Sequence, residues 1–212
     1  MINVKSFVFN PFQENTYILY DDTKECVIID PGCCNERERQ QLRQFIAAES
    51  LQPVRLLNTH GHIDHVFGNR YIADEFQVKL HLHPEDLVTL NRVMESAKLY
   101  QIPYDRSPEP EGWLEDGDRI RFGGSELEVL FVPGHAPGHV AFADREGGLV
   151  IGGDVLFRGT VGRTDLPGSN HDLLIRSIRT KLLPLGDTYI VYPGHGPSTT
   201  IADEMRRNPF LK

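Results

Sequence analysis

Metal-capable side chains gather between residues 56 and 68, in the stretch LNTHGHIDHVFGN. Three histidines and an aspartate fall within six consecutive positions there, at His60, His62, Asp64 and His65. Imidazole nitrogens and carboxylate oxygens are the donors that divalent metal ions take in proteins. Chance clustering on a solvated loop is the weaker interpretation, because the whole chain of 212 residues holds only nine histidines. The spacing predicts a metal-binding loop.

Three later motifs place similar side chains at the ends of predicted strands. They are VPGHAPGHV with His135 and His139, VIGGDVLF with Asp154, and VYPGHGPST with His195. Each is flanked by glycine or proline, whose turns fix the backbone where a ligand has to be held. Imidazoles and carboxylates without thiolates suit zinc, iron or manganese with one position left open for water. The seven candidate ligands are too many for one tetrahedral ion, and suit two ions that share a carboxylate and a hydroxide.

The elements that must position these residues follow from hydrophobic periodicity and turn residues. Strands are expected at 2–9, 15–21, 25–32, 54–60, 78–83, 119–122, 127–132, 139–144, 148–157 and 188–196. Helices are expected at 35–50, 66–76, 84–99, 171–183 and 199–208, with Asn35 and Thr200 as N-terminal caps. Strands and helices that alternate in this way, twice over, predict two sheets enclosed by helices.

Composition restricts the classes of partner. A net charge of −8 argues against a nucleic-acid backbone or an anionic membrane surface as the main partner. No apolar run approaches the roughly 18 residues of a membrane helix. The three cysteines, Cys26, Cys33 and Cys34, do not form a disulfide framework, and the N-terminus lacks the pattern of a signal peptide. We therefore expect a cytoplasmic protein, monomeric or homodimeric, with a single domain over residues 1–212.

Taken in order, THGHIDH, PGHAPGH, GGD and PGHG resemble the motifs of the metallo-β-lactamase fold superfamily, with matches from residue 30 to residue 195. The resemblance implies an α/β fold, an αββα sandwich of two mixed β-sheets flanked by helices. Two further stretches, GDVLFRGTVGRTDLPG and YPGHGPSTTIADEMRRNPFL, are similar to short glyoxalase II-like hydrolases. We expect no counterpart of the C-terminal helical substrate domain of glyoxalase II, which leaves glutathione specificity open.

The resemblance also implies a role for each candidate residue. His60, His62 and His135 would hold a first ion, Asp64, His65 and His195 a second, and Asp154 would bridge them. Asp30 in IIDPG matches an aspartate that supports the metal loops from behind, although an Asp-Pro turn has the same sequence. His139 is expected to order the His135 loop by hydrogen bonding. Arg163 stands at the position of a substrate-binding lysine, and a solvated loop arginine is an equal alternative.

The implied activity is hydrolysis of a small-molecule thioester such as S-lactoylglutathione, by attack of a metal-bridging hydroxide. The cofactors would be two divalent ions, zinc before iron or manganese, with Asp64 and Asp154 as the catalytic carboxylates. A thiol leaving group, with a pKa of about 8.5, needs little proton donation. A β-lactam nitrogen needs more, which metal-bound water or Asp64 would have to supply.

Three alternatives remain open on the sequence. Gly162–Asp165 also resembles iron persulfide dioxygenases, which bind one iron through the equivalents of His60, His135 and Asp154. A lactonase of the same fold and a non-catalytic metal-binding protein are the others. Residues 100–113, YQIPYDRSPEPEGW, combine prolines with aromatic side chains. They predict either a loop that covers the metal pocket and selects substrates, or a surface loop whose aromatics pack on the core.

Overall fold

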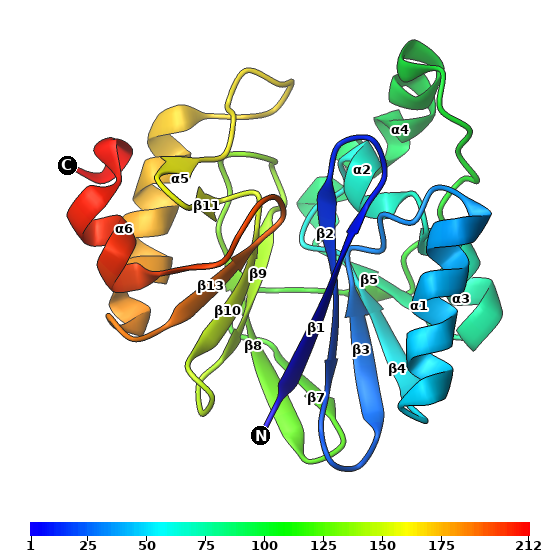
Figure 1. The fold of residues 1–212 in the computed structure, drawn as a ribbon. Helices are drawn as coiled ribbons and strands as arrows, with labels where there is room; N and C mark the ends of the chain where they lie inside the picture. The colour runs from blue at the N-terminus through cyan, green and yellow to red at the C-terminus, as the bar shows by residue number, and fades with distance from the viewer.

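Two six-stranded β-sheets lie face to face at the centre of the computed structural model, which describes residues 1–212 (Figure 1). The first sheet runs β1-β2-β3-β4-β5-β6, with bounds Asn3–Phe9, Glu14–Tyr20, Glu25–Ile29, Gln52–Leu57, Leu80–Leu82 and Gly112–Trp113. The second runs β14-β13-β10-β9-β8-β7, with bounds Thr199–Thr200, Ile190–Pro193, Leu149–Gly153, Val140–Asp144, Ser125–Phe131 and Arg119–Phe122. A small hairpin pairs β11 (Leu156–Phe157) with β12 (Thr160–Val161).

Both sheets are mixed, as the family resemblance predicts. In the first, β1 to β3 pair antiparallel, whereas β3 to β6 pair parallel. In the second, β7 to β10 pair antiparallel, β10 and β13 pair parallel, and β14 closes the edge antiparallel. The parallel pairs matter for the site, because neighbouring parallel strands end at the same edge of a sheet.

Side-chain alternation along the central strands explains the layering. On β2, Ile18 faces the helices that cover the first sheet, whereas Leu19 faces the second sheet. On β9, Phe142 lies between the sheets and Ala141 faces the helices of the other side. All four side chains are fully buried. A strand that is apolar on both faces is stable only between two covered layers, so the αββα sandwich follows from the sequence.

The helices form the two outer layers (Figure 1). Over the first sheet lie α1 (Glu36–Ala48) and α3 (Asn69–Phe76), with α2 (Ile63–Val66) and α4 (Leu87–Tyr100) at its upper edge. Over the second lie α5 (His171–Ser177) and α6 (Ile201–Arg207). Short 3-10 turns occupy Pro84–Asp86, Leu183–Leu185 and Pro209–Leu211, and a π-helical turn occupies Ile178–Leu182. No helix has the length and apolar character that crossing a membrane requires.

The predicted N-terminal caps are confirmed, whereas two of the helices expected to be continuous are interrupted. The Asn35 side chain accepts from Glu38 N at the start of α1, and Thr200 accepts from Asp203 N at the start of α6. The continuous helix expected at 66–76 is wrong, because Gly68 interrupts it. Gly68 N donates to the Pro31 carbonyl at 2.7 Å, which ties this turn to the IIDPG segment, and α3 starts only afterwards. The expected helix at 171–183 likewise changes from α to π geometry after Ser177.

Candidate metal centre

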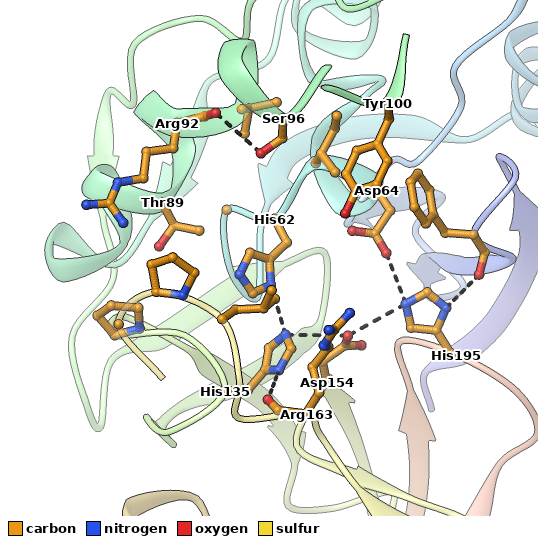
Figure 2. Close-up of a pocket in the computed structure, with 18 of the residues that line it drawn as sticks. His62, Asp64, Thr89, Arg92, Ser96, Tyr100, His135, Asp154, Arg163 and His195 are labelled. Carbon is orange, nitrogen blue, oxygen red and sulfur yellow. Dashed lines mark hydrogen bonds and ion pairs between the residues drawn. The ribbon is translucent and has the colours of Figure 1, made fainter. Parts of the chain in front are cut away.

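All four histidine- and aspartate-bearing motifs meet at one edge of the sandwich. His60 to His65 follow β4 and enter α2, His135 follows β8, Asp154 follows β10, and His195 follows β13. The common end of parallel β10 and β13 puts Asp154 and His195 side by side, and Figure 2 shows both turned toward His135 and Asp64. The seven candidate ligands are therefore brought together in space, from positions up to 135 residues apart in the chain.

Three histidines make the first cluster. Ring nitrogens of His60, His62 and His135 all lie within 4.8 Å of one another, and His62 Nδ1 is 2.9 Å from His135 Nε2. His60 and His135 are buried, whereas His62 is partly exposed. Three imidazoles that converge in this way match the donor set of a catalytic zinc-type site.

Asp64, His65 and His195 make the second cluster. One donor atom from each lies within 4.8 Å of the others. Asp64 Oδ2 is 3.1 Å from His195 Nε2 and 3.6 Å from His65 Nε2. His65 is fully buried, so this cluster is anchored in the core on one side and opens to the surface at His195.

Asp154 lies between the two clusters. Its Oδ2 is 3.5 Å from His135 Nε2 in the first cluster and 3.6 Å from His195 Nε2 in the second. Its Oδ1 is 3.5 Å from His65 Nε2. One carboxylate thus reaches both clusters, as a carboxylate shared by two ions must.

Hydrogen bonds on the outer nitrogen orient three of the rings. His65 Nδ1 contacts Asp30 Oδ2 at 3.1 Å, His135 Nδ1 contacts the Arg163 carbonyl at 2.8 Å, and His195 Nδ1 contacts the Phe12 carbonyl at 3.1 Å. The inner atoms His60 Nε2, His65 Nε2 and Asp154 Oδ1 are buried without a hydrogen-bond partner. Buried polar atoms are normally paired, so these unpaired atoms fit bound cations.

Asp30 also lies within ligand distance, in a group with His60 and His65. Its oxygens are already used, however, since they accept from Thr59 N at 2.7 Å and from Thr59 Oγ1 at 2.5 Å, as well as from His65. Thr59 Oγ1 in turn lies 3.0 Å from His60 Nδ1. We therefore assign Asp30 to orienting His65 directly and His60 through Thr59, rather than to binding an ion.

Electrostatics prepare the first cluster for a cation. Burial lowers the pKa of His62 to about 3 and lowers the pKa of His60 well below its usual value. Burial opposes charge on Asp154 as well, but the adjacent His65 lowers the pKa of its carboxyl. Neutral imidazoles and an ionised carboxylate are the forms that coordinate metal.

His139 supports a different loop from the one expected. Its Nε2 accepts from the backbone N of Asp154 at 3.1 Å, and its ring stacks on His60 with centroids 4.6 Å apart. The hydrogen bond fixes the turn that carries Asp154, rather than the loop that carries His135.

A groove with a volume of about 1080 Å³ lies above the two clusters. His62, Asp64, His135, Asp154 and His195 are among the residues that line it. One wall is the exposed face of α4, where Thr89, Arg92, Ser96 and Tyr100 lie, and the other includes β11, β12 and the loop to Gly168 (Figure 2). A groove of this size takes a small molecule of drug-like dimensions.

Arg163 lines the groove, but its guanidinium is paired. Its Nε and Nη2 each lie 2.7 Å from a carboxylate oxygen of Asp165. The backbone of Arg163 has a role that the sequence did not reveal: its carbonyl orients the His135 ring.

The hypothesis that residues 100–113 cover the pocket is wrong. Tyr100, the last residue of α4, is the only one of them that lines the groove. Tyr104 packs edge-on against Phe67 in the core, and Ser107 Oγ accepts from Asn69 Nδ2 at 3.1 Å. Of the aromatic side chains in this stretch, Tyr104 packs on the core, whereas Trp113 is exposed and does not line the groove.

The α4 wall is the functional feature that sequence reasoning missed. Leu90 and Val93 pack into the core, and they satisfy the helical pattern on their own. Val88 and Leu99 fall outside that apolar stripe and are 47% and 77% exposed. Exposed apolar residues on a second face of an amphipathic helix were the available signal.

Known proteins resemble this chain over nearly its whole length. Residues 9–195 match the model of the metallo-beta-lactamase superfamily. The hydroxyacylglutathione hydrolase GloC of Haemophilus influenzae is 39% identical over 212 residues, 99% of this chain and 98% of that protein.

Solved structures give the same result. TTHA1623, in a di-iron-bound form, has a TM-score of 0.88 and 40% identity, with 98% of this chain and 100% of that chain covered. The B3 metallo-beta-lactamase BLEG-1 has a TM-score of 0.90 and 36% identity, with both chains covered in full. The chain belongs to the metallo-beta-lactamase superfamily, and it carries the histidine and aspartate metal-binding clusters of a metallo-hydrolase.

Proposed function

We propose that this protein is a binuclear metallo-hydrolase that cleaves the thioester of a small anionic thiol, with S-lactoylglutathione as the first substrate to test. The observation that carries the proposal is the position of Asp154, within 3.6 Å of donor nitrogens in both clusters. The activity named for the 39% identical Haemophilus relative supports the choice of a glutathione thioester.

The residues of this chain provide a rigid floor for the reaction. Two bound divalent ions would supply Lewis acidity and would lower the pKa of water to about 7. His65, His135 and His195 each keep their orientation through a hydrogen bond on the outer nitrogen. These three side chains would therefore already be oriented when substrate binds, which favours stabilisation of the transition state.

Leaving-group chemistry supports a thioester. A thiolate leaves without a proton, since its conjugate acid has a pKa of about 8.5, whereas an amide nitrogen must be protonated. The titratable side chains of the groove outside the clusters are Glu95, Tyr100 and arginines. We assign proton transfer to Asp64, a cluster carboxylate whose side chain reaches the groove, rather than to Glu95 on the α4 wall.

The groove walls support an anionic thiol carrier. Apolar side chains such as Val88, Leu99 and Phe157 line it, together with Arg92, Arg158 and Arg163. Arg158 donates to the Ser198 carbonyl, and Arg163 is paired with Asp165. Arg92 makes no ion pair and no side-chain hydrogen bond. We propose Arg92, before Arg163, as the contact for a substrate carboxylate.

A substrate panel tests the reaction class. The metal-loaded protein would be assayed with S-lactoylglutathione, an acyl-coenzyme A, an acyl N-acetylcysteamine, a lactone, a β-lactam and glutathione persulfide with oxygen uptake recorded. The proposal expects the highest kcat/KM with the glutathione thioester. A clear preference for the lactone or the β-lactam, or oxygen consumption with the persulfide, would contradict it.

Arg92→Gln tests the anion contact. A partly exposed charge pair contributes about 1 kcal/mol, so KM for S-lactoylglutathione should rise about five-fold. KM for the uncharged N-acetylcysteamine thioester should stay unchanged. Arg37→Gln is the matched control, because Arg37 is also exposed but lies on α1, away from the groove. Equal effects of Arg92→Gln on both thioesters would rule out carboxylate recognition by this arginine.

A further inference from the structure

Asp86 is a fully buried carboxylate that belongs to neither metal cluster. It ends the turn Pro84–Asp86, directly before α4. Its Oδ2 accepts the backbone N–H of Gly61, the residue between His60 and His62. Its Oδ1 accepts the backbone N–H of Gly138 at 3.1 Å. One side chain thus bonds both loops that supply the first cluster.

The same two glycines leave no room for a side chain. A Cβ on Gly61 would lie 2.7 Å from Leu90 N, and a Cβ on Gly138 would collide with the backbone N of Asp86. The two loops therefore press directly against the start of α4. Glycine is needed at both positions because the helix backbone approaches so closely.

We propose that Asp86 is a positioning residue that sets the distance between the His60–His62 loop and the His135 loop, and thereby the geometry of the first metal cluster. The carboxylate is buried, and each of its two oxygens accepts a hydrogen bond from one of these loops. Charge-assisted hydrogen bonds to backbone N–H groups are short and directional, which suits fixing two loops relative to each other.

Asp86 also joins the metal centre to the groove wall. Thr89 Oγ1 donates to Asp86 Oδ1 at 2.9 Å, and Thr89 lies on the groove-facing side of α4 above His62 (Figure 2). The same carboxylate therefore holds both the groove wall and the two loops of the first cluster in place.

The test is metal binding by Asp86→Asn, and it rests on the proposed metal centre but not on the thioester. An asparagine keeps one acceptor oxygen and turns an N–H donor toward either Gly61 or the Gly138–Thr89 side. Metal-free protein would be titrated with Co²⁺, with visible absorption recorded and with a chelator in competition. One of the two ions should bind about 10- to 100-fold more weakly, with an altered absorption spectrum, while the other keeps its affinity.

Asp21→Asn is the matched control. Asp21 is also a buried aspartate that accepts from backbone and hydroxyl groups, including Gly124 N and Ser125 Oγ, both at 2.8 Å. It lies at the end of β2 far from the site. Wild-type Co²⁺ binding by Asp86→Asn, or an equal loss in Asp21→Asn, would overturn the proposal. A wild-type protein that binds no Co²⁺ would instead refute the metal centre itself.

If Asp86→Asn does not fold, amide hydrogen exchange of the metal-free wild-type protein provides the test. The Gly61 and Gly138 amides lie in loops, where exchange is ordinarily fast. Strong protection of both is expected if the carboxylate holds them without metal. Fast exchange of either amide would overturn the proposal.

Discussion

Replacing Asp30 by asparagine should lower both the stability of the fold and the metal affinity of the Asp64–His65–His195 cluster. The two effects can be measured separately. Asp30 Oδ1 accepts from Thr59 N at 2.7 Å, and Oδ2 accepts from Thr59 Oγ1 at 2.5 Å and faces His65 Nδ1 at 3.1 Å. An asparagine that keeps the first bond presents an NH₂ group to the other two. Its backbone has φ +49°, a conformation that asparagine tolerates well, so the backbone adds no penalty.

The expected magnitudes follow from these contacts. The Thr59 hydroxyl can rotate and accept from the new amide, whereas His65 must change tautomer and place a proton on Nε2. The bonds to a charged carboxylate are then replaced by bonds to a neutral amide, which lowers the free energy of unfolding by about 1–2 kcal/mol. A protonated Nε2 cannot bind metal, so affinity at the Asp64–His65–His195 cluster should fall about 10- to 100-fold.

Urea unfolding of the metal-free protein measures the first quantity, and chelator competition on the folded protein measures the second. Asp21→Asn again serves as the control, because it removes similar bonds far from the clusters. An Asp30→Asn protein that loses stability but binds both ions with wild-type affinity would refute the orienting role of Asp30 and leave only a structural one.

Three further perturbations test separate parts of the account. His195→Ala should weaken one of two ions by metal analysis, and equal loss of both would contradict separate clusters. Glu204 accepts from Gly159 N at 2.8 Å, in the hairpin that lines the groove. Glu204→Gln should therefore lower the free energy of unfolding by about 1–3 kcal/mol and raise KM. Unchanged values of both would contradict the support of the hairpin by Glu204. Burial alone would raise the pKa of Asp21, but hydrogen bonds, that from Thr23 foremost, lower it. Its carboxylate therefore stabilises the fold above the unfolded pKa of about 3.9, and the deficit of Asp21→Asn in urea should shrink as pH falls below that value; a constant deficit would refute this.

The sequence predicts what depends on local pattern. Ile18 and Leu19 are both apolar and face opposite ways, which is how a strand between two covered layers is recognised. The ligand motifs are equally local, because each joins a donor side chain to the glycine or proline turn that ends its strand. Their convergence was expected from the family resemblance, which assigns the seven ligands to two ions that share Asp154.

Roles that arise only from tertiary contacts could not be predicted. Asp86 in HPEDL has the sequence of an ordinary acidic first turn, and its partners lie 25 and 52 residues away. The carbonyl of Arg163 is invisible in a motif that draws attention to its guanidinium. Gly68 interrupts a helix where its N–H bonds the Pro31 carbonyl. Helical periodicity cannot predict a contact between residues so far apart in the chain.

The number of ions bound per chain tests the central claim most directly. Metal-free protein would be reconstituted with zinc, passed through a desalting column and measured by elemental mass spectrometry beside Asp154→Ala. The account predicts about two ions per wild-type chain, and loss of tight binding at both clusters in Asp154→Ala with an unchanged circular dichroism spectrum. One ion per wild-type chain, or full occupancy in Asp154→Ala, would contradict a centre in which one carboxylate serves both clusters.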